Sequence, residues 1–212
     1  MAIVLERVAF TADFDETISV TVNTGEQVAL GTKDEEVSTT NNPSSAGFTF
    51  TQVADKILFG GAAAQWHTSS ASGSDGSKTL NPGYSGTFGE SCALVYSGAG
   101  DVGEHSEATF SGTSPRAGSI TNNTEPDAAF QTVIGAFGFI DFSAWTESQT
   151  EQFDGQSAGV GAVVVSSTAA RNGGATIGSQ EGGVASFYWY PAAEAAAGAA
   201  PGSTGLFSHA FR

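Results

Sequence analysis

Basic residues are scarce in this chain. Seven Lys and Arg stand against 22 Asp and Glu, which gives a formal net charge of −15. Lysine occurs only at Lys33, Lys56 and Lys78. A protein that neutralises phosphates needs basic patches, so this balance argues against direct binding of nucleic acid. An anionic membrane surface would also repel the chain. We therefore expect neither nucleic acid nor membrane among its partners.

Cysteine and long apolar runs are also missing. The single Cys92 rules out a disulfide framework within one chain, and we expect it to be a small buried residue rather than a reactive thiol. No stretch approaches the length of a transmembrane helix. The N-terminus lacks the apolar core and the small-residue cleavage site of a secretory signal, so we expect synthesis in the cytoplasm without that export route.

The chain does contain enough hydrophobic residues to form a large core. Hydrophobic residues make up 40% of its 212 residues, with 15 Phe, and 28 Gly fall mostly between apolar runs. This combination favours a folded, turn-rich β protein over a disordered one. We expect one domain over residues 1–190, an Ala/Pro/Gly-rich linker or short helix over 191–204, and a C-terminal docking segment over 205–212.

Two apolar runs near the middle of the chain are predicted to be core strands of one antiparallel sheet. They are Val133–Phe142 and Val160–Val165, and a polar link with Trp145 separates them. Burial is expected throughout Val133–Phe142, at Val163 and Val165, and at Phe187. A Val164→Asp or Phe139→Ala substitution should then destabilise the protein by several kcal/mol, about 3–5 for a buried Phe.

Alternating patterns predict further strands. Ile18–Val22 and Gln27–Leu30 are interpreted as a hairpin over 17–31, and other strands are expected around Phe48–Phe50, Ala93–Tyr96, Glu104–Phe110 and Val184–Tyr190. About nine or ten strands result, with no amphipathic helix between them. The predicted fold class is all-β: an antiparallel, jelly-roll-like β-sandwich with long Gly/Ser/Thr-rich loops.

The sequence contains no recognisable catalytic or metal-binding motif. His67, His105 and His209 lie far apart, none has a second His or Cys at ligand spacing, and there is no G-x-S-x-G elbow. The acids of DFDE at 13–16 and DEE at 34–36 do not fit an EF-hand and are interpreted as solvated rather than calcium-binding. We therefore assign no catalytic, ligand-binding or metal-ligating residue and no cofactor.

Aromatic residues leave two interpretations open. A sandwich core or a subunit interface would use them, and so would a sugar-binding platform or a polysaccharide-cleaving cleft with two carboxylates. The residues concerned are Trp66, Tyr84, Trp145 and Trp189.

Two segments resemble a known group of proteins. Residues 79–112, TLNPGYSGTF…ESCALVYSGAGDVGEHSEATFSG, resemble modules with a Pro-Gly-aromatic turn, a strand ending in an aromatic residue, a Gly/acid loop and a Thr/Phe strand. Residues 142–178 resemble a second pattern of the same modules, with a Trp-Thr-Glu turn, a small-residue strand and an Ala-Arg-x-Gly-Gly turn. Both patterns resemble surface β-sandwich proteins of tailed-phage virions, such as capsid decorations, head fibres and tail-associated proteins. Tyr84 stands where these modules usually have Trp, and the loop at 111–130 departs from the pattern.

The resemblance implies a non-enzymatic virion structural protein whose partners are other virion proteins and copies of itself. The alternatives are a carbohydrate- or receptor-binding adhesin module, which would contact a host-surface glycan, and a polysaccharide hydrolase. Attachment to a particle needs an apolar patch or a free strand edge. The candidates are Ala2–Phe10 and the tail Leu206–Arg212. The alternative interpretation of the tail is a terminal strand that closes its own sandwich.

Overall fold

A computed structural model describes residues 2–11, 17–34, 43–57, 63–83, 89–121 and 127–193. This part of the chain contains sixteen strands and no helix. Ten strands form two five-stranded antiparallel sheets, and six form three two-stranded ribbons. The predicted all-β antiparallel sandwich is therefore confirmed, whereas the jelly-roll-like connectivity stays a prediction. Over these ranges the chain has no helix of the length and apolarity needed to cross a membrane.

Among the described residues, the edge strands of the first sheet are β1 and β4. Its order is β1 (Val4–Thr11), β7 (Gly89–Ser97), β3 (Gln27–Asp34), β5 (Ala63–Ser69) and β4 (Phe50–Ile57). The second sheet has its free edges at β12 and β8. Its order is β12 (Thr150–Asp154), β13 (Ala158–Val165), β10 (Ala128–Ala136), β16 (Gln180–Pro191) and β8 (Ala99–Gly112).

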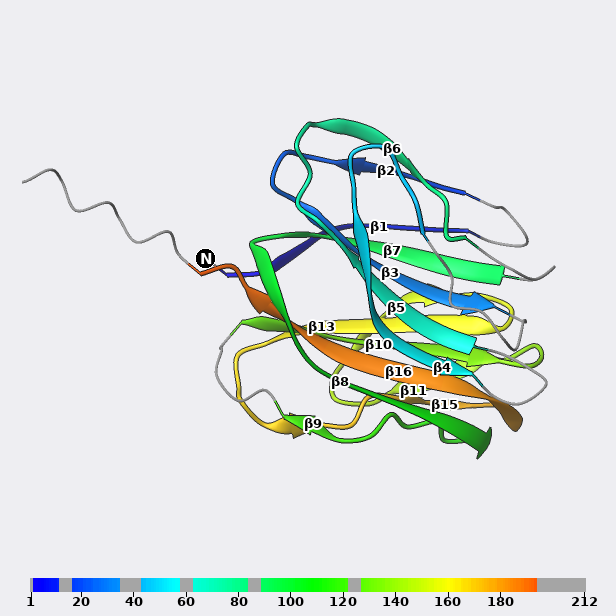
Figure 1. Cartoon of the computed structure of the whole chain (residues 1–212). Coiled ribbons are helices and arrows are strands. Elements are labelled where there is room, and N and C mark those ends of the chain that lie inside the picture. The colour runs from blue at the N-terminus through cyan, green and yellow to red at the C-terminus, as the bar shows by residue number, and fades with distance from the viewer. Residues whose placement is uncertain are drawn as a thin grey trace, which may run out of the picture.

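The ribbons form outer layers on the two sheets. They pair β2 (Ile18–Val22) with β6 (Gly76–Leu80), β11 (Phe142–Trp145) with β15 (Ala175–Ile177), and β9 (Ile120–Thr121) with β14 (Ala170–Arg171). Figure 1 shows the large sheets stacked face to face, with β2–β6 above the first sheet and β11, β15 and β9 below the second. The molecule is thus layered beyond an ordinary two-sheet sandwich.

Aromatic side chains fill the space between the two sheets. Trp66 of β5 meets Phe187 of β16 with ring centroids 5.2 Å apart, and Tyr96 of β7 meets Trp189 of β16 at 5.6 Å. All four side chains are buried. Such edge-to-face pairs add to the free energy gained from the large apolar area that each ring buries.

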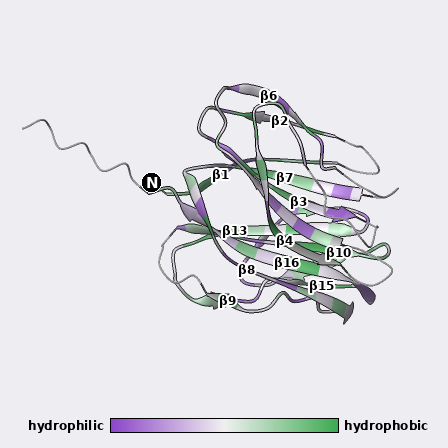
Figure 2. Ribbon diagram, in the orientation of Figure 1, coloured by the Kyte–Doolittle hydropathy of each residue, from purple (hydrophilic) through white to green (hydrophobic). Residues whose placement is uncertain are grey.

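The central strands are buried on both faces because ribbons cover the outer side of each sheet. Beneath β2–β6, for example, Ile18 and Val20 pack on Leu30 and Val95. Every residue of β10 is buried, and so are eight successive residues of β7. Figure 2 shows hydrophobic colour concentrated on these inner strands. Burial on both faces explains why their sequences are almost continuously apolar instead of alternating.

The predicted central pair is confirmed in part. Strands β10 and β13 are antiparallel neighbours, with Val133 opposite Val160. The run 133–142, however, is not one strand, because β10 ends at Ala136 and the chain leaves the sheet before β11 begins. In that connection Phe137 and Phe139 are 60% and 78% exposed, so the prediction that they are buried is wrong.

The other burial predictions are also confirmed only in part. Val165 and Phe187 are buried, and Val163 is half-buried. Val164 is 41% exposed, contrary to expectation. It shares a side of β13 with Val160 and Ala162, but it lies at the end of the strand, beyond the residues that pack between the sheets.

The predicted hairpin over 17–31 is wrong. Strand β2 pairs with β6 in the outer ribbon, whereas β3 pairs with β5 and β7 in the first sheet. The expected turn does form, and its Gly25 has a φ of 84°, which favours glycine. It carries the chain from the outer ribbon into the sheet.

Most of the remaining strand predictions are confirmed. Residues 93–96 lie in β7, 104–110 in β8 and 184–190 in β16, while Phe48 precedes β4. The count of nine or ten is too low, because β2 was the ribbon strand identified in full and most of the other short ribbon strands were not predicted. The expected C-terminal docking segment and most of the linker fall outside the described residues, which end at residue 193.

Candidate functional site

The tryptophans chosen as possible sugar contacts lie mostly in the core. Trp66 and Trp189 are buried, and their indole N–H groups donate to the backbone oxygens of Ala185 (3.1 Å) and Gly100 (3.0 Å). A sugar platform on these two residues is therefore wrong, and the core interpretation holds. Trp145 is half-buried and stacks on Phe142 with centroids 5.3 Å apart. Tyr84 lies outside the described residues.

The predicted titratable candidates do not converge. His67 is buried in β5 of the first sheet, and His105 is exposed on β8 of the second. Within the described ranges, no group of three or more His, Cys, Asp or Glu is arranged to hold a metal ion. Of the acidic runs, Asp34 is buried at the end of β3, so the interpretation of this residue as solvated is wrong. Residues 13–16 and 35–36, and the third histidine at 209, lie outside the description.

Cys92 is fully buried in the core between the sheets, as expected. Burial raises the pKa of its thiol far above the ordinary value. Because the thiolate is the reactive form, Cys92 is an unreactive packing residue.

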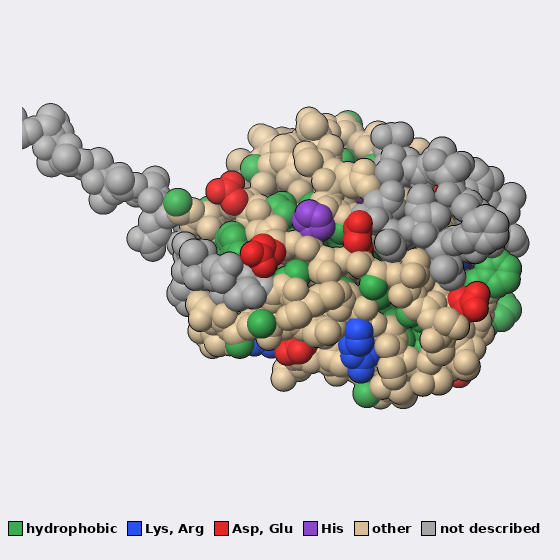
Figure 3. Space-filling view, turned by 60° about the horizontal axis from the view of Figure 1, so that its bottom comes forward, with side chains coloured by type: hydrophobic (Ala, Val, Ile, Leu, Met, Phe, Trp, Pro, Cys, Tyr) green, Lys and Arg blue, Asp and Glu red, His purple; other side chains and the backbone are tan. Residues whose placement is uncertain are grey.

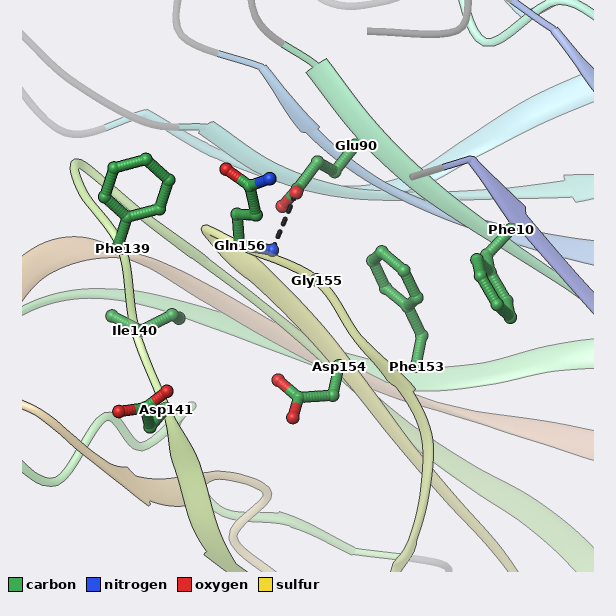
Figure 4. A pocket seen from close by; sticks show the side chains of 9 residues that line it. All are labelled: Phe10, Glu90, Phe139, Ile140, Asp141, Phe153, Asp154, Gly155 and Gln156. Carbon is green, nitrogen blue, oxygen red and sulfur yellow. Dashed lines mark hydrogen bonds between the residues drawn. The ribbon is translucent and has the colours of Figure 1, made fainter. Parts of the chain in front are cut away.

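A hollow of about 340 Å³ opens where the free edges β1 and β12 lie side by side. Four separate parts of the chain line it: β1, β7, the β10–β11 connection, and β12 with the turn that follows. Figure 4 shows these side chains arranged around the opening. The lining residues are Phe10, Glu90, Phe139, Ile140, Asp141, Phe153, Asp154, Gly155 and Gln156. We call this site the aromatic hollow.

Two phenylalanines present open surface at the aromatic hollow. Phe10 is 55% exposed and Phe139 is 78% exposed. Phe10 leans on the buried Phe153, with ring centroids 5.1 Å apart, so the contact spans the two sheets. Phe137, from the same connection as Phe139, is 60% exposed, but it lines a separate hollow with Ser111 of β8 and Gln180 of β16. Exposed large apolar side chains gathered in one place are typical of an interaction site.

Hydrogen bonds hold the connection that carries Phe139. The backbone N–H of Phe137 donates to Glu181 O (2.9 Å), and that of Ile140 donates to Gln156 O (2.9 Å). The side-chain Nε2 of Gln180 donates to Phe139 O (3.3 Å). The connection is therefore fixed to β16 on one side and to the β12–β13 turn on the other.

Glu90 links the two sheets at the aromatic hollow. This buried carboxylate comes from β7 of the first sheet and accepts hydrogen bonds from the N–H groups of Gln156 (2.8 Å) and Ser157 (2.9 Å). The hydroxyl of Ser157 donates to it as well, at 3.1 Å. These three hydrogen bonds to a charged acceptor join the first sheet to a turn of the second. They hold the residues that line the hollow in place.

The polar part of the lining is acidic. Glu90, Asp141 and Asp154 contribute carboxylates, and the lining contains no Lys, Arg or His. Partial desolvation, together with the charges of Glu151, Asp141 and Glu90, raises the pKa of the Asp154 carboxyl. A cation placed here would lower that pKa again and be attracted electrostatically.

The comparisons with known proteins add no family assignment, because no protein-family model, curated protein or solved structure matches this chain. The aromatic hollow was not predicted from the sequence. The available signal was Gly138 between two phenylalanines, since glycine inside an apolar run marks a possible break of the strand. The arrangement offers apolar contact and negative charge, which suits binding rather than nucleophilic chemistry.

Proposed function

We propose that this protein is a non-enzymatic structural protein of a virion surface, in the manner of a capsid decoration or a tail-associated protein. The observation that carries the proposal is the aromatic hollow: a fixed, exposed apolar surface at a free sandwich edge. A protein held on a particle needs such an attachment surface. The resemblance of residues 79–112 and 142–178 to phage surface modules supports the choice of particle.

The N-terminal attachment candidate gains support from its position. Strand β1 is a free edge of the first sheet, and Phe10 at its end opens to the surface. Val4 on the same strand is 46% exposed. The alternative attachment segment, residues 206–212, lies outside the described residues.

The layered architecture also suits a structural role. Both large sheets have their outer faces covered by ribbons of the same chain, which extends the apolar core through several layers. The acidic exterior favours solubility at high local concentration. Figure 3 shows acidic side chains scattered over one face, with hydrophobic side chains gathered at one margin.

The test is whether the protein belongs to intact particles. Virions of the organism that encodes it are purified on a density gradient, and the protein is quantified against the major coat protein by mass spectrometry. We expect a fixed copy number that survives washing in moderate salt. Its absence from the particles would overturn the proposal.

The adhesin alternative requires an aromatic platform open to a sugar ring, and Trp66 and Trp189 are buried. Among the described residues, Trp145 is the tryptophan with part of its ring near the surface. Glycan-array binding that is lost in Trp145→Ala would favour the adhesin over the structural protein.

A further inference from the structure

The aromatic hollow is suited to a particular kind of partner, which its apolar surface, its rigidity and its charge define together. Transfer of a phenyl ring from water into an apolar contact is favourable. The side chains of Phe10 and Phe139 are each more than half exposed to solvent. The two rings lie at opposite sides of the hollow (Figure 4), so a partner segment with apolar side chains that spans it would cover both.

The hollow is formed before a partner arrives. The connection carrying Phe139 is hydrogen-bonded to Glu181 and Gln156, and Phe10 is braced by Phe153. Preformed sites avoid the entropy cost of ordering a loop on binding. The exposed rings are therefore available as anchors at little conformational cost.

Charge selects among the possible partners. Asp141 and Asp154 lie beside each other near the exposed rings (Figure 4). Basic side chains on the neighbouring strands do not line the hollow: Arg7 of β1 pairs with Glu26, and Lys33, opposite Glu90 in the β3–β7 pairing, is buried. A second copy of this chain would bring the same carboxylates and a further −15 charge to the contact. Juxtaposed like charges disfavour such a dimer.

We propose that the aromatic hollow docks a segment of a different protein that presents Lys or Arg next to an apolar side chain. Apolar side chains of the segment pack on Phe10 and Phe139 at the two sides of the hollow, and the cation faces Asp141 and Asp154. This inference rests on the proposed function, because it gives the chemistry of the particle component that holds the protein.

Two variants remove the apolar and the electrostatic contributions to recognition separately. Phe139→Ala removes the exposed ring, and the double variant Asp141→Asn/Asp154→Asn removes two charges. Their matched controls are Val164→Ala, an exposed apolar residue at the far end of β13, and Asp101→Asn/Glu104→Gln on β8, at the opposite edge of the sandwich. The second control changes the net charge equally, so it separates local recognition from general attraction to an acidic protein.

The probes are fluorescent ten-residue peptides of alternating Leu and Lys, and the same peptides with Glu in place of Lys. Fluorescence anisotropy is measured at about 0.15 M salt, where the Debye length is about 8 Å and long-range attraction is screened. We expect the Lys peptide to bind and the Glu peptide not to bind. Both hollow variants should weaken binding about tenfold or more, and both controls should leave it unchanged.

Equal effects of hollow and control variants would overturn the inference, because binding would then be nonspecific. Concentration-dependent dimerisation of the wild-type chain that Phe139→Ala abolishes would also overturn it, since the occupant would be a second copy. Particle incorporation of the variants separates this inference from the proposed function. If both hollow variants join particles as well as the wild type does, the docking inference fails while the structural role stands.

Discussion

At the level of single residues, the exposed fraction of a phenylalanine determines what its removal costs. Phe187 is fully buried between the sheets, whereas Phe139 is 78% exposed. We expect Phe187→Ala to lower the free energy of unfolding by about 3–5 kcal/mol. Phe139→Ala should change it by no more than about 0.5 kcal/mol. Urea unfolding of the two variants, followed by tryptophan fluorescence, measures both values. A large loss for Phe139→Ala would mean that this ring is packed.

Glu26 is a second residue whose surroundings make a prediction. Burial opposes its ionisation, but hydrogen bonds from Asn23 and Arg7, together with the Arg7 charge, outweigh burial and lower the pKa of the Glu26 carboxyl. The N–H of Asn23 donates to it at 2.7 Å. We expect Glu26→Gln to cost about 1–3 kcal/mol at pH 7, the usual range for hydrogen bonds to a charged group.

The pH dependence of this loss has a definite sign. The unfolded carboxyl titrates near 4.5 and the folded one at a lower pH, so Glu26 stabilises the fold above about 4.5. That contribution disappears as the pH falls through the folded pKa. The stability difference between wild type and Glu26→Gln should therefore shrink on acidification, as parallel urea titrations at pH 7 and pH 3 would measure. A difference that grows at low pH would contradict this assignment.

At the level of elements, the ribbon β11–β15 covers the second sheet because β13 carries glycines beneath its aromatic rings. A Cβ added at Gly159 would lie 2.4 Å from the Phe142 ring, and one added at Gly161 would lie 2.4 Å from Trp145. The small-residue strand thus creates the space that lets the ribbon lie flat on the sheet.

The matched test compares Gly161→Ala with Gly178→Ala, where an added Cβ meets nothing within 4 Å. We expect Gly161→Ala to destabilise the protein by about 1–3 kcal/mol, the usual cost of overpacking. Gly178→Ala should be close to neutral. Differential scanning calorimetry on both variants gives the comparison, and equal midpoints would show that the ribbon is not packed on β13.

Elements were predictable from sequence to the extent that their pattern is local. Alternation at 18–22 identified β2, and the apolar run at 160–165 identified most of β13. Strand partners were not predictable in the same way. Ile18 pairs with Leu80, and nothing in the alternation of β2 distinguishes that distant strand from the nearby β3. Strand β2 has one buried face and is bounded by short polar turns. Both features are compatible with either β3 or β6 as its partner.

The aromatic hollow could not be predicted from the sequence, for a related reason. Its lining comes from residues near 10, 90, 140 and 154, which only the stacking of two sheets brings together. The run at 133–142 also hid the exposed Phe139, because apolar character continues past the point where β10 ends. Hydrophobicity alone does not reveal that the chain has left the sheet.

At the level of the whole molecule, all described strands lie within residues 2–193. The ten strands of the two large sheets come from residues 4–191, and we expect deletion of residues 205–212 to leave the fold intact. Far-ultraviolet circular dichroism should show the same β-type spectrum, and the thermal midpoint should stay within about 2 °C. Loss of cooperative unfolding in the truncated protein would show that these residues belong to the core.

The position of β16 has a consequence for synthesis of the protein. This strand lies between β8 and β10 in the second sheet, yet it is the last strand described along the chain. Until residues 180–191 leave the ribosome, β8 and β10 have no strand to join them, and their edges stay open to other chains. Pairings this distant in sequence form slowly. A premature stop before β16 would therefore yield aggregating fragments rather than a smaller domain, and the second sheet can finish folding only after β16 has been made.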